Sequence, residues 1–145
     1  MKTALFTGSF DPFTIGHADL VSRLLPLFDR IIIVIGQNQD KQRFFPLQDT
    51  FDRINTYYNN ENKIEVVVYN GLTIDAARQY GADVIVKGVR NEHDYLYEKA
   101  QAVANKELAG IETLLLNASP KFEHISSSFV RDLYKHNYDI SKYIV

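Results

Sequence analysis

The sequence contains no cysteine in its 145 residues. Disulfide bonds, a cysteine nucleophile, and zinc or iron–sulfur centres held by cysteine are therefore all excluded. The lack of cysteine is compatible with a reducing cytosol.

Long apolar runs and clusters of basic residues are also missing. No stretch approaches the roughly 20 apolar residues that cross a bilayer, and the N-terminus MKTALFTGSF is too short and too polar for a signal peptide. The formal net charge is −2, and no block of lysine or arginine favours nucleic-acid binding. We therefore expect a soluble cytoplasmic protein with neither a membrane nor a nucleic acid as partner.

Short apolar runs alternate along the chain with longer segments of helical spacing. The runs are rich in β-branched residues and apolar at consecutive positions, which is typical of strands buried on both faces of a parallel sheet. They lie at Ala4–Phe6, Ile31–Ile35, Val66–Tyr69, Val84–Val86 and Thr113–Leu116. The helices are predicted around Leu20–Leu25, Phe51–Tyr58, Ile74–Arg78, Leu96–Leu108 and Ser127–His136. This alternation predicts a single α/β domain over residues 1–145, with a doubly wound, five-stranded parallel sheet.

The first candidate site is the segment Thr7–His17, which joins the first predicted strand to the first helix. Gly8 lets the backbone approach a phosphate, and Ser9 adds a hydroxyl. His17 lies in the first helical turn, where unpaired N–H groups favour an anion and the helix dipole disfavours a charged imidazole. An ordinary strand–turn–helix connection is the alternative, because neither G-x-G-x-x-G nor G-x-x-x-x-G-K-[ST] is present.

The second candidate is Lys87–Arg90, at the end of the fourth predicted strand. Two cations around Gly88 form a natural phosphate clamp, although a solvated turn has the same composition. Asp94 and Glu98 follow on the next helix. They could bind ribose hydroxyls, a metal or the basic pair, or simply be surface charges.

The third candidate is Ile125–Ser128, which precedes the last predicted helix. One serine is expected to cap the helix, and three would also supply donors for a di- or triphosphate. Lys41 and Arg43 lie in the long loop after the second strand, where either could swing over a bound anion. Because these segments follow strands one, two, four and five, their side chains are expected at one edge of the sheet, as a nucleotide site requires.

The combination of these segments resembles a known enzyme superfamily. Gly8–Pro12 followed by Thr14–His17 is similar to the first signature of the nucleotidyltransferases that carry H/T-x-G-H, and Ile125–Ser128 is similar to their second signature. The Lys87–Arg90 segment and Lys41 indicate one particular family within this superfamily. Over residues 2–138, the chain resembles the bacterial phosphopantetheine adenylyltransferase family, whose sheet is of the Rossmann-like nucleotidyltransferase type.

The resemblance implies an activity: transfer of the adenylyl group of ATP to 4′-phosphopantetheine, which yields dephospho-coenzyme A and pyrophosphate. It also implies Mg²⁺ bound through the ATP phosphates rather than by metal-ligating residues, and assembly as a homohexamer. Because the attacking phosphate is already an anion, direct in-line attack needs neither a general base nor a covalent intermediate. Positioning and electrostatic stabilisation are then the main tasks of the protein.

The resemblance also assigns roles to residues. Catalysis would fall to His17, Lys41 and Arg90. ATP would be bound by Ser9, Phe10, His17, Gly88, Val89, Arg90, Glu98, Phe122, Glu123, His124, Ile125, Ser126, Ser127 and Ser128. Phosphopantetheine would be bound by Ser9, Lys41, Thr73 and Lys87.

The chain departs from the family pattern at a few positions. Lys87 stands where the family usually has arginine, so the charge remains but bidentate geometry is lost. Ser9 replaces a more common threonine, His124 replaces an apolar or aromatic residue, and the chain ends before the C-terminal helix of many relatives. Nicotinate-mononucleotide adenylyltransferase and glycerol-phosphate cytidylyltransferase are alternatives, although their loops usually carry histidine at the position of Thr14. A non-catalytic nucleotide-binding module would not require this set of residues at one edge.

Overall fold

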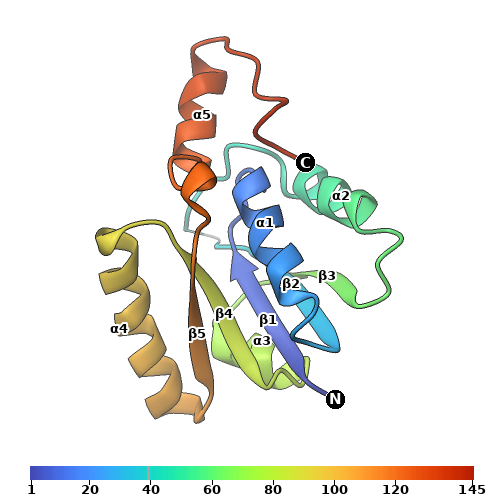
Figure 1. The fold of residues 1–145 in the computed structure, drawn as a ribbon, viewed down its shortest axis with the longest axis vertical. Helices are drawn as coiled ribbons and strands as arrows, with labels where there is room; N and C mark the ends of the chain where they lie inside the picture. Colours follow the sequence, from blue (N-terminus) through green and yellow to red (C-terminus); the bar gives the residue numbers. More distant parts are fainter. Residues whose placement is uncertain (39) are drawn as a thin grey trace.

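The computed structural model describes residues 1–38 and 40–145. Its centre is a five-stranded sheet with the strand order β3-β2-β1-β4-β5 (Figure 1). All four strand pairings are parallel. The strands are β1 Thr3–Gly8, β2 Arg30–Gly36, β3 Ile64–Tyr69, β4 Val84–Val89 and β5 Glu112–Asn117. The predicted doubly wound parallel sheet is therefore confirmed.

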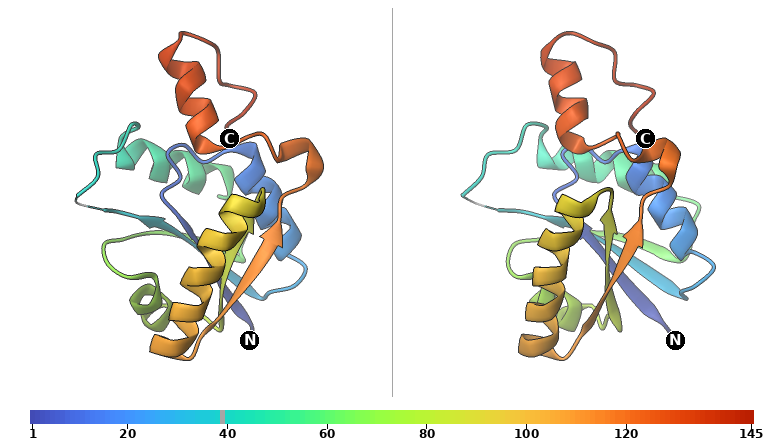
Figure 2. Two further views of the ribbon diagram at one scale, coloured as in Figure 1. Left: turned by 90° about the vertical axis from the view of Figure 1, so that its left-hand side faces the viewer. Right: turned by 60° about the vertical axis from the view of Figure 1, so that its left-hand side comes forward.

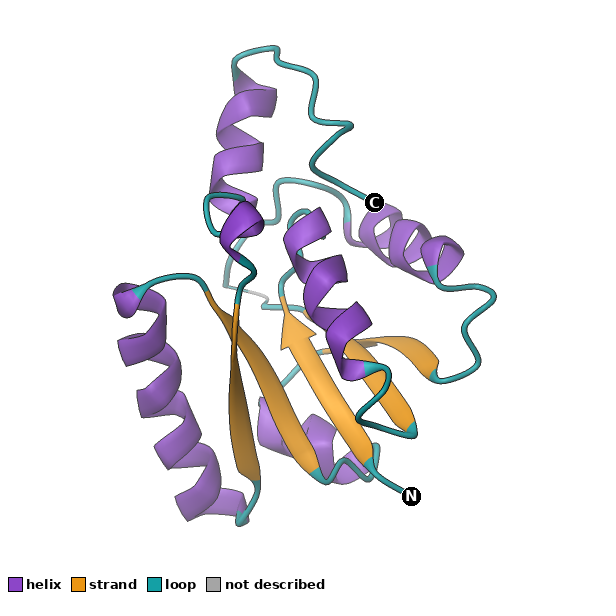
Figure 3. Cartoon of the chain, viewed as in Figure 1, coloured by secondary structure: helices purple, strands orange, loops and turns teal. Residues whose placement is uncertain are grey.

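Helices alternate with these strands along the chain (Figure 3). They are α1 Ile15–Leu24, α2 Leu47–Tyr57, α3 Thr73–Gln79, α4 Glu92–Ala109 and α5 Ser127–Lys135, with a short 3₁₀ turn at Pro120–Phe122. Side-chain caps at Thr14, Asn91 and Ser126 begin α1, α4 and α5. Gly110, with a φ of 68°, ends α4 in the left-handed conformation that glycine adopts readily. Among the described residues, no helix combines the length and the apolar character needed to cross a membrane.

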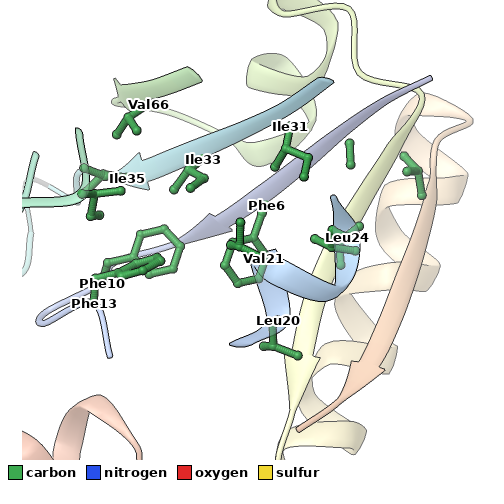
Figure 4. Close-up of a cluster of buried hydrophobic side chains, with 14 residues drawn as sticks. Phe6, Phe10, Phe13, Leu20, Val21, Leu24, Ile31, Ile33, Ile35 and Val66 are labelled. Atoms are coloured by element: carbon green, nitrogen blue, oxygen red, sulfur yellow. The ribbon is translucent and has the colours of Figure 1, made fainter. Parts of the chain in front are cut away.

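The core has two layers because each strand alternates its side chains between the faces of the sheet. On one face, Phe6 and Ile33 pack against Leu20, Val21 and Leu24 of α1 (Figure 4). On the other face, the buried strand residues Leu5, Ile32, Val34 and Ile85 pack against Ile74, Ala76 and Ala77 of α3. The consecutive apolar positions in the strands are explained by burial on both sides.

The longest helix, α4, packs along β5 and β4 but contributes no fully buried residue. Leu96, Val103 and Leu108, apolar residues of this predicted helix, are 63%, 60% and 66% exposed. The helix is confirmed, but these apolar residues do not belong to the core of the chain.

The last helix, α5, stands beyond the carboxyl ends of the strands (Figure 2). It shares a small apolar cluster with the C-terminal segment through Val130 and Ile140. That segment returns to α1, where the backbone N–H of Ile15 donates to the carbonyl of Tyr143 at 2.9 Å and Thr14 bridges Ile144. The end of the chain is thus attached to the N-terminus of α1.

The strand order also determines where a ligand can bind. From β1 the chain proceeds outward to β2 and β3, and it then returns to place β4 on the other side of β1. In open α/β sheets, the crevice at the carboxyl ends of the strands where the order reverses is the usual ligand site. In this chain that crevice lies between β1 and β4.

Candidate active site

A cavity of about 320 Å³ lies at the carboxyl ends of β1 and β4. Its walls come from the β1–α1 loop, the first turn of α1, the end of β4, the start of α4 and the N-terminus of α5. The residues that line it are Phe6, Thr7, Gly8, Ser9, Phe10, Thr14, Gly16, His17, Leu20, Lys41, Lys87, Gly88, Val89, Arg90, Asp94, Glu98, Ala118, Phe122, Ile125, Ser126, Ser127, Ser128 and Arg131. The three candidate segments therefore meet at one site, as predicted.

His17 is oriented by the residue that caps its own helix. The Thr14 hydroxyl accepts a hydrogen bond from the His17 backbone N–H at 3.3 Å, and the Thr14 N–H donates to His17 Nδ1 at 2.9 Å. Because Nδ1 is the acceptor, the proton of a neutral imidazole resides on Nε2. The ring can therefore offer an Nε2–H donor to the cavity that it lines.

The surroundings of His17 favour the neutral ring. Its imidazole packs edge-on against Phe10, with 5.0 Å between the ring centroids, and lies 5.3 Å from the ring of Phe13. Burial, followed by the charges of Lys87 and Arg90, lowers the pKa of His17 from 6.5 to about 3. At neutral pH the residue is thus an uncharged hydrogen-bond donor beside two cations.

Lys87 lies where two cavities meet. Its Nζ donates to the carbonyl of Thr7 at 3.1 Å and lies 3.6 Å from Glu98 Oε1. Burial raises the pKa of Glu98, while the charge of Lys87 lowers it in part. Beyond this pair lies a second cavity of about 310 Å³, which Lys87, Glu98 and Thr73 line together.

Arg90 is held by the helix that follows it. Its Nε and one terminal nitrogen donate to the two carboxylate oxygens of Asp94, at 2.9 and 3.2 Å. Asn91 caps α4 by accepting from the N–H of Asp94 at 2.9 Å. Of the roles considered for Asp94 and Glu98, the structure shows pairing with the basic residues Arg90 and Lys87.

Each of the three serines has a different contact. Ser126 is the N-cap of α5 and accepts from the N–H of Phe129 at 2.9 Å. Ser127 donates to the carbonyl of Pro12 at 2.8 Å, and Ser128 accepts from Arg131 at 3.0 Å. The N-termini of α1 and α5 therefore both border the cavity, and their unpaired N–H groups make it suitable for phosphate.

The long loop after β2 contributes one of its two basic candidates to the cavity. Lys41 lines the cavity and remains exposed. Arg43, the other of the two, does not swing over the site, because its guanidinium is bound to the carbonyls of Ser9 and Phe10 and to Thr50. Of the two open possibilities, the structure therefore favours Lys41.

Three of the proposed binding residues lie outside the main cavity. Thr73 lines the second cavity, beyond Lys87 and Glu98. Glu123 and His124 are exposed and do not line either cavity. The ring of His124 instead packs against Phe129, 5.9 Å away.

Some residues of the site were not predicted from the sequence. Thr14 was noted only as a signature residue, although its spacing of three from His17 is that of a capping box. Arg131 lines the cavity and donates to the carbonyl of Asp11 at 2.7 Å. No pattern in the sequence distinguishes Arg131 from a surface arginine of an amphipathic helix.

Two solved structures have a fold similar to that of this chain. One is a bifunctional NMN adenylyltransferase/ADP ribose pyrophosphatase from Francisella tularensis, with a TM-score of 0.66, 15% identity and coverage of 99% of this chain and 44% of that one. Another is a lipopolysaccharide core biosynthesis protein from Thermoplasma volcanium, with a TM-score of 0.57, 19% identity and coverage of 82% and 97%. At this level of identity they support the fold alone.

Similarity in sequence extends over nearly the whole chain. The cytidylyltransferase-like family matches residues 5–133. A phosphopantetheine adenylyltransferase from Bacteroides fragilis is 45% identical over 144 residues, which are 99% of this chain and 96% of that protein. One from Cytophaga hutchinsonii is 42% identical over the same shares of the two chains. The chain therefore belongs to the phosphopantetheine adenylyltransferase family of nucleotidyltransferases.

Proposed function

We propose that this chain transfers the adenylyl group of ATP to 4′-phosphopantetheine and so forms dephospho-coenzyme A and pyrophosphate. Its family membership supports this reaction. The observation that carries the proposal is one cavity at the sheet's reversal point, where His17, Lys41, Lys87 and Arg90 meet two helix N-termini. That cavity matches a reaction between two phosphate-bearing substrates.

The charge of the cavity suits its proposed ligands. Its wall holds four cationic side chains, Lys41, Lys87, Arg90 and Arg131, and two carboxylates, Asp94 and Glu98. Each carboxylate is paired with a cation, Asp94 with Arg90 and Glu98 with Lys87. The remaining positive charge attracts anions and stabilises negative charge that develops on a phosphorus centre.

We assign the chemical step to positioning and electrostatics. The Nε2–H of His17 donates to an oxygen of the ATP α-phosphate, and Arg90 supports the charge that builds there. Ser9, Lys41 and Lys87 hold the attacking phosphate in line with the leaving pyrophosphate. The phosphate attacks as the anion that it already is, so the chain supplies geometry and donors rather than a base.

In this proposal, each of the two adjoining cavities binds a different substrate. ATP lies against Ser9, Phe10, the end of β4 and Ser126–Ser128. The pantetheine arm extends past Lys87 into the cavity of about 310 Å³ that Thr73 lines. Lys87, shared by both cavities, is then the residue at which the substrates meet.

We also propose that Mg²⁺ is carried into the site by ATP. Asp94 and Glu98, the carboxylates of the cavity, are engaged by Arg90 and Lys87, so the phosphate oxygens are the ligands that fit the ion better. Bound there, Mg²⁺ would neutralise part of the triphosphate charge. Removing it with a chelator should abolish pyrophosphate release and leave the folded state intact.

The experiment that tests the reaction is an acceptor comparison. The purified protein receives ATP and Mg²⁺ with phosphopantetheine, nicotinate mononucleotide or glycerol phosphate, and also CTP with glycerol phosphate. Pyrophosphate release only in the reaction that contains phosphopantetheine supports the proposal. Release with another acceptor would identify one of the alternative enzymes, and no release with any acceptor would overturn the proposed activity.

We further propose that the chain acts in the cytoplasm, where its substrate ATP is made, and assembles as a homohexamer. Exposed apolar side chains on α4 and β5 support association. Leu96, Val103 and Leu108 of α4 and Leu114 of β5 expose 49–66% of their surface. Apolar side chains with this exposure are candidates for contacts between subunits.

A further inference from the structure

Arg43 connects two loops that lie far apart in the sequence. Its guanidinium donates to the carbonyls of Ser9 and Phe10, to Thr50 Oγ1 at 2.9 Å, and to the carbonyl of Phe45 at 3.1 Å. The side chain is only 15% exposed. Because most of its N–H groups already have partners in the protein, Arg43 is built to hold backbone rather than to bind a ligand.

Asp11 completes the connection from the opposite side. Its two carboxylate oxygens accept from the backbone N–H groups of Phe44 and Phe45, both at 2.8 Å. Asp11 Oδ1 also lies 3.7 Å from the guanidinium of Arg43. The loop after β2, which carries Lys41 and Arg43, is therefore joined to the β1–α1 loop by hydrogen bonds to its backbone carbonyls and to the Asp11 carboxylate.

The carbonyls bound by Arg43 lie on either side of a backbone conformation that non-glycine residues rarely adopt. Phe10 has a φ of 48°, in the left-handed region that costs energy for a residue with a Cβ. This conformation places the Phe10 ring beside Gly8, where an added Cβ would lie 2.9 Å from Phe10 Cε1. The same ring packs edge-on against His17, with the centroids 5.0 Å apart.

We propose that Arg43 is a positioning residue of the active site, which holds Phe10 in its left-handed conformation and thereby keeps the His17 ring and the Ser9 turn in place. Arg43 is absent from the wall of the main cavity, so it acts through Ser9 and Phe10. Its effect on turnover rests on the proposed function, whereas its effect on the His17 ring does not. Since Arg43 follows Lys41 by two residues, the same bonds set the position of the lysine loop.

The test compares Arg43→Ala and Arg43→Lys with Arg78→Ala, a variant of an exposed arginine on α3. We expect Arg43→Ala to lower kcat by about 10- to 100-fold, as a displacement near 1 Å can do, and to change KM for ATP by less than about threefold. Millimolar guanidinium should restore part of the turnover. Arg43→Lys should stay well below the unmodified enzyme, since an ammonium group cannot reproduce the planar fork.

A second readout needs no substrate. The ring-proton NMR signals of His17, assigned by their loss in His17→Asn, should shift in both Arg43 variants and stay in place in Arg78→Ala. Unchanged His17 signals, or an unchanged kcat, would overturn the proposal. If Arg43→Ala does not fold, Arg43→Lys carries both measurements. If the unmodified protein shows no adenylyl transfer, the proposed function fails, but the NMR comparison still decides the role of Arg43.

Discussion

At the scale of single residues, His17 shows how neighbours determine what a side chain can do. The backbone N–H of Thr14 occupies Nδ1, while burial and two nearby cations keep the ring uncharged. A charged imidazole would attract phosphate more strongly, but it would have to form beside Lys87 and Arg90. The structure instead provides a neutral donor and leaves the positive charge to those two residues.

His17→Ala should lower kcat by about 100- to 1,000-fold, because it removes a donor aimed at charge that develops in the transition state. ATP affinity should fall far less, since Arg90 and the serines remain. Turnover measured at saturating substrates, together with ATP binding by calorimetry, separates the two effects. His136→Ala, at an exposed position, is the matched control. Near-normal turnover in His17→Ala would contradict the assigned role.

The low pKa of His17 also predicts how stability depends on pH. Its pKa is about 3 in the folded protein and near 6.5 when unfolded, so between these values the unfolded state binds the additional proton. The free energy of unfolding should therefore decrease as pH falls from about 6.5 towards 3, by up to about 1.4 kcal/mol per pH unit for one proton. Above pH 6.5 this contribution is complete.

Urea unfolding of the wild-type protein and His17→Asn at several pH values measures this slope. The variant should lose stability less steeply below pH 6.5. The raised pKa of Glu98 acts in the opposite direction in both proteins, so it largely cancels in the difference. Equal slopes would show that His17 is not held neutral by the fold.

At the scale of elements, the site depends on how closely β4 approaches α1. Gly88 lies in β4 opposite Leu20 of α1, and a Cβ at Gly88 would collide with Leu20 Cδ1. Glycine at this position therefore allows the strand that carries Lys87 and Arg90 to pack against the helix that carries His17. The cap of α1 then sets the direction of His17 within its first turn.

Gly88→Ala should destabilise the protein by about 1–3 kcal/mol, the usual cost of overpacking a core contact. Gly36→Ala is the matched control, because its added Cβ meets only the Gly8 carbonyl oxygen at an ordinary 3.7 Å. Denaturant unfolding of both variants gives the comparison. If Gly88→Ala were as stable as Gly36→Ala, Leu20 would have to move freely, and the close approach of β4 to α1 would not be required.

Thr14→Val should cost about 1 kcal/mol of stability, because valine keeps the shape of this buried residue but removes the hydroxyl that accepts from the N–H of His17. Thr14→Ser retains the hydroxyl and should remain close to the wild-type protein. Thermal or urea unfolding measures both. Full stability in Thr14→Val would show that the hydroxyl does not stabilise the helix, and a loss in Thr14→Ser alone would assign the effect to packing of the threonine methyl group.

At the scale of the whole molecule, several apolar side chains of α4 are exposed on the surface of the single subunit. Helix α4 borders the second cavity, since its Leu108 lines that cavity and is 66% exposed. Assembly through α4 would cover apolar side chains that the core leaves out. The interface between subunits would then lie next to the proposed pantetheine cavity.

Val103→Glu should dissociate the proposed hexamer, because a charge buried in an apolar interface lacks a partner. The chain should remain folded, since Val103 is 60% exposed in the single subunit. Light scattering after size-exclusion chromatography gives the mass, and circular dichroism checks the fold. Asn55→Glu, at an exposed position of α2, introduces the same single negative charge and is the control for the change of charge alone. A monomeric wild-type protein would contradict the proposed assembly.

Local patterns in the sequence were sufficient to predict much of this protein. The strands and helices follow from apolar periodicity, and the N-cap of α5 follows from Ser126 before an apolar run. The meeting of Ser9, Arg90 and Ser128 at one edge could also be predicted, because the carboxyl ends of parallel strands lie together. These features depend on residues that are close in the chain, or on a rule that holds for the whole fold class.

The tertiary structure decided the features that depend on distant neighbours. Arg43 was one of two candidates to lie over the ligand, but it is bound to Ser9, 34 residues away, and Lys87 is bound to Thr7, 80 residues away. The tautomer and pKa of His17 depend on the side chains that enclose it, and the apolar residues of α4 are exposed because no other element of the described chain covers them. The sequence by itself determined the elements, the family and the edge that holds the site. Which partner each polar group takes was decided by folding, because hydrogen bonds and burial depend on distance in space rather than along the chain.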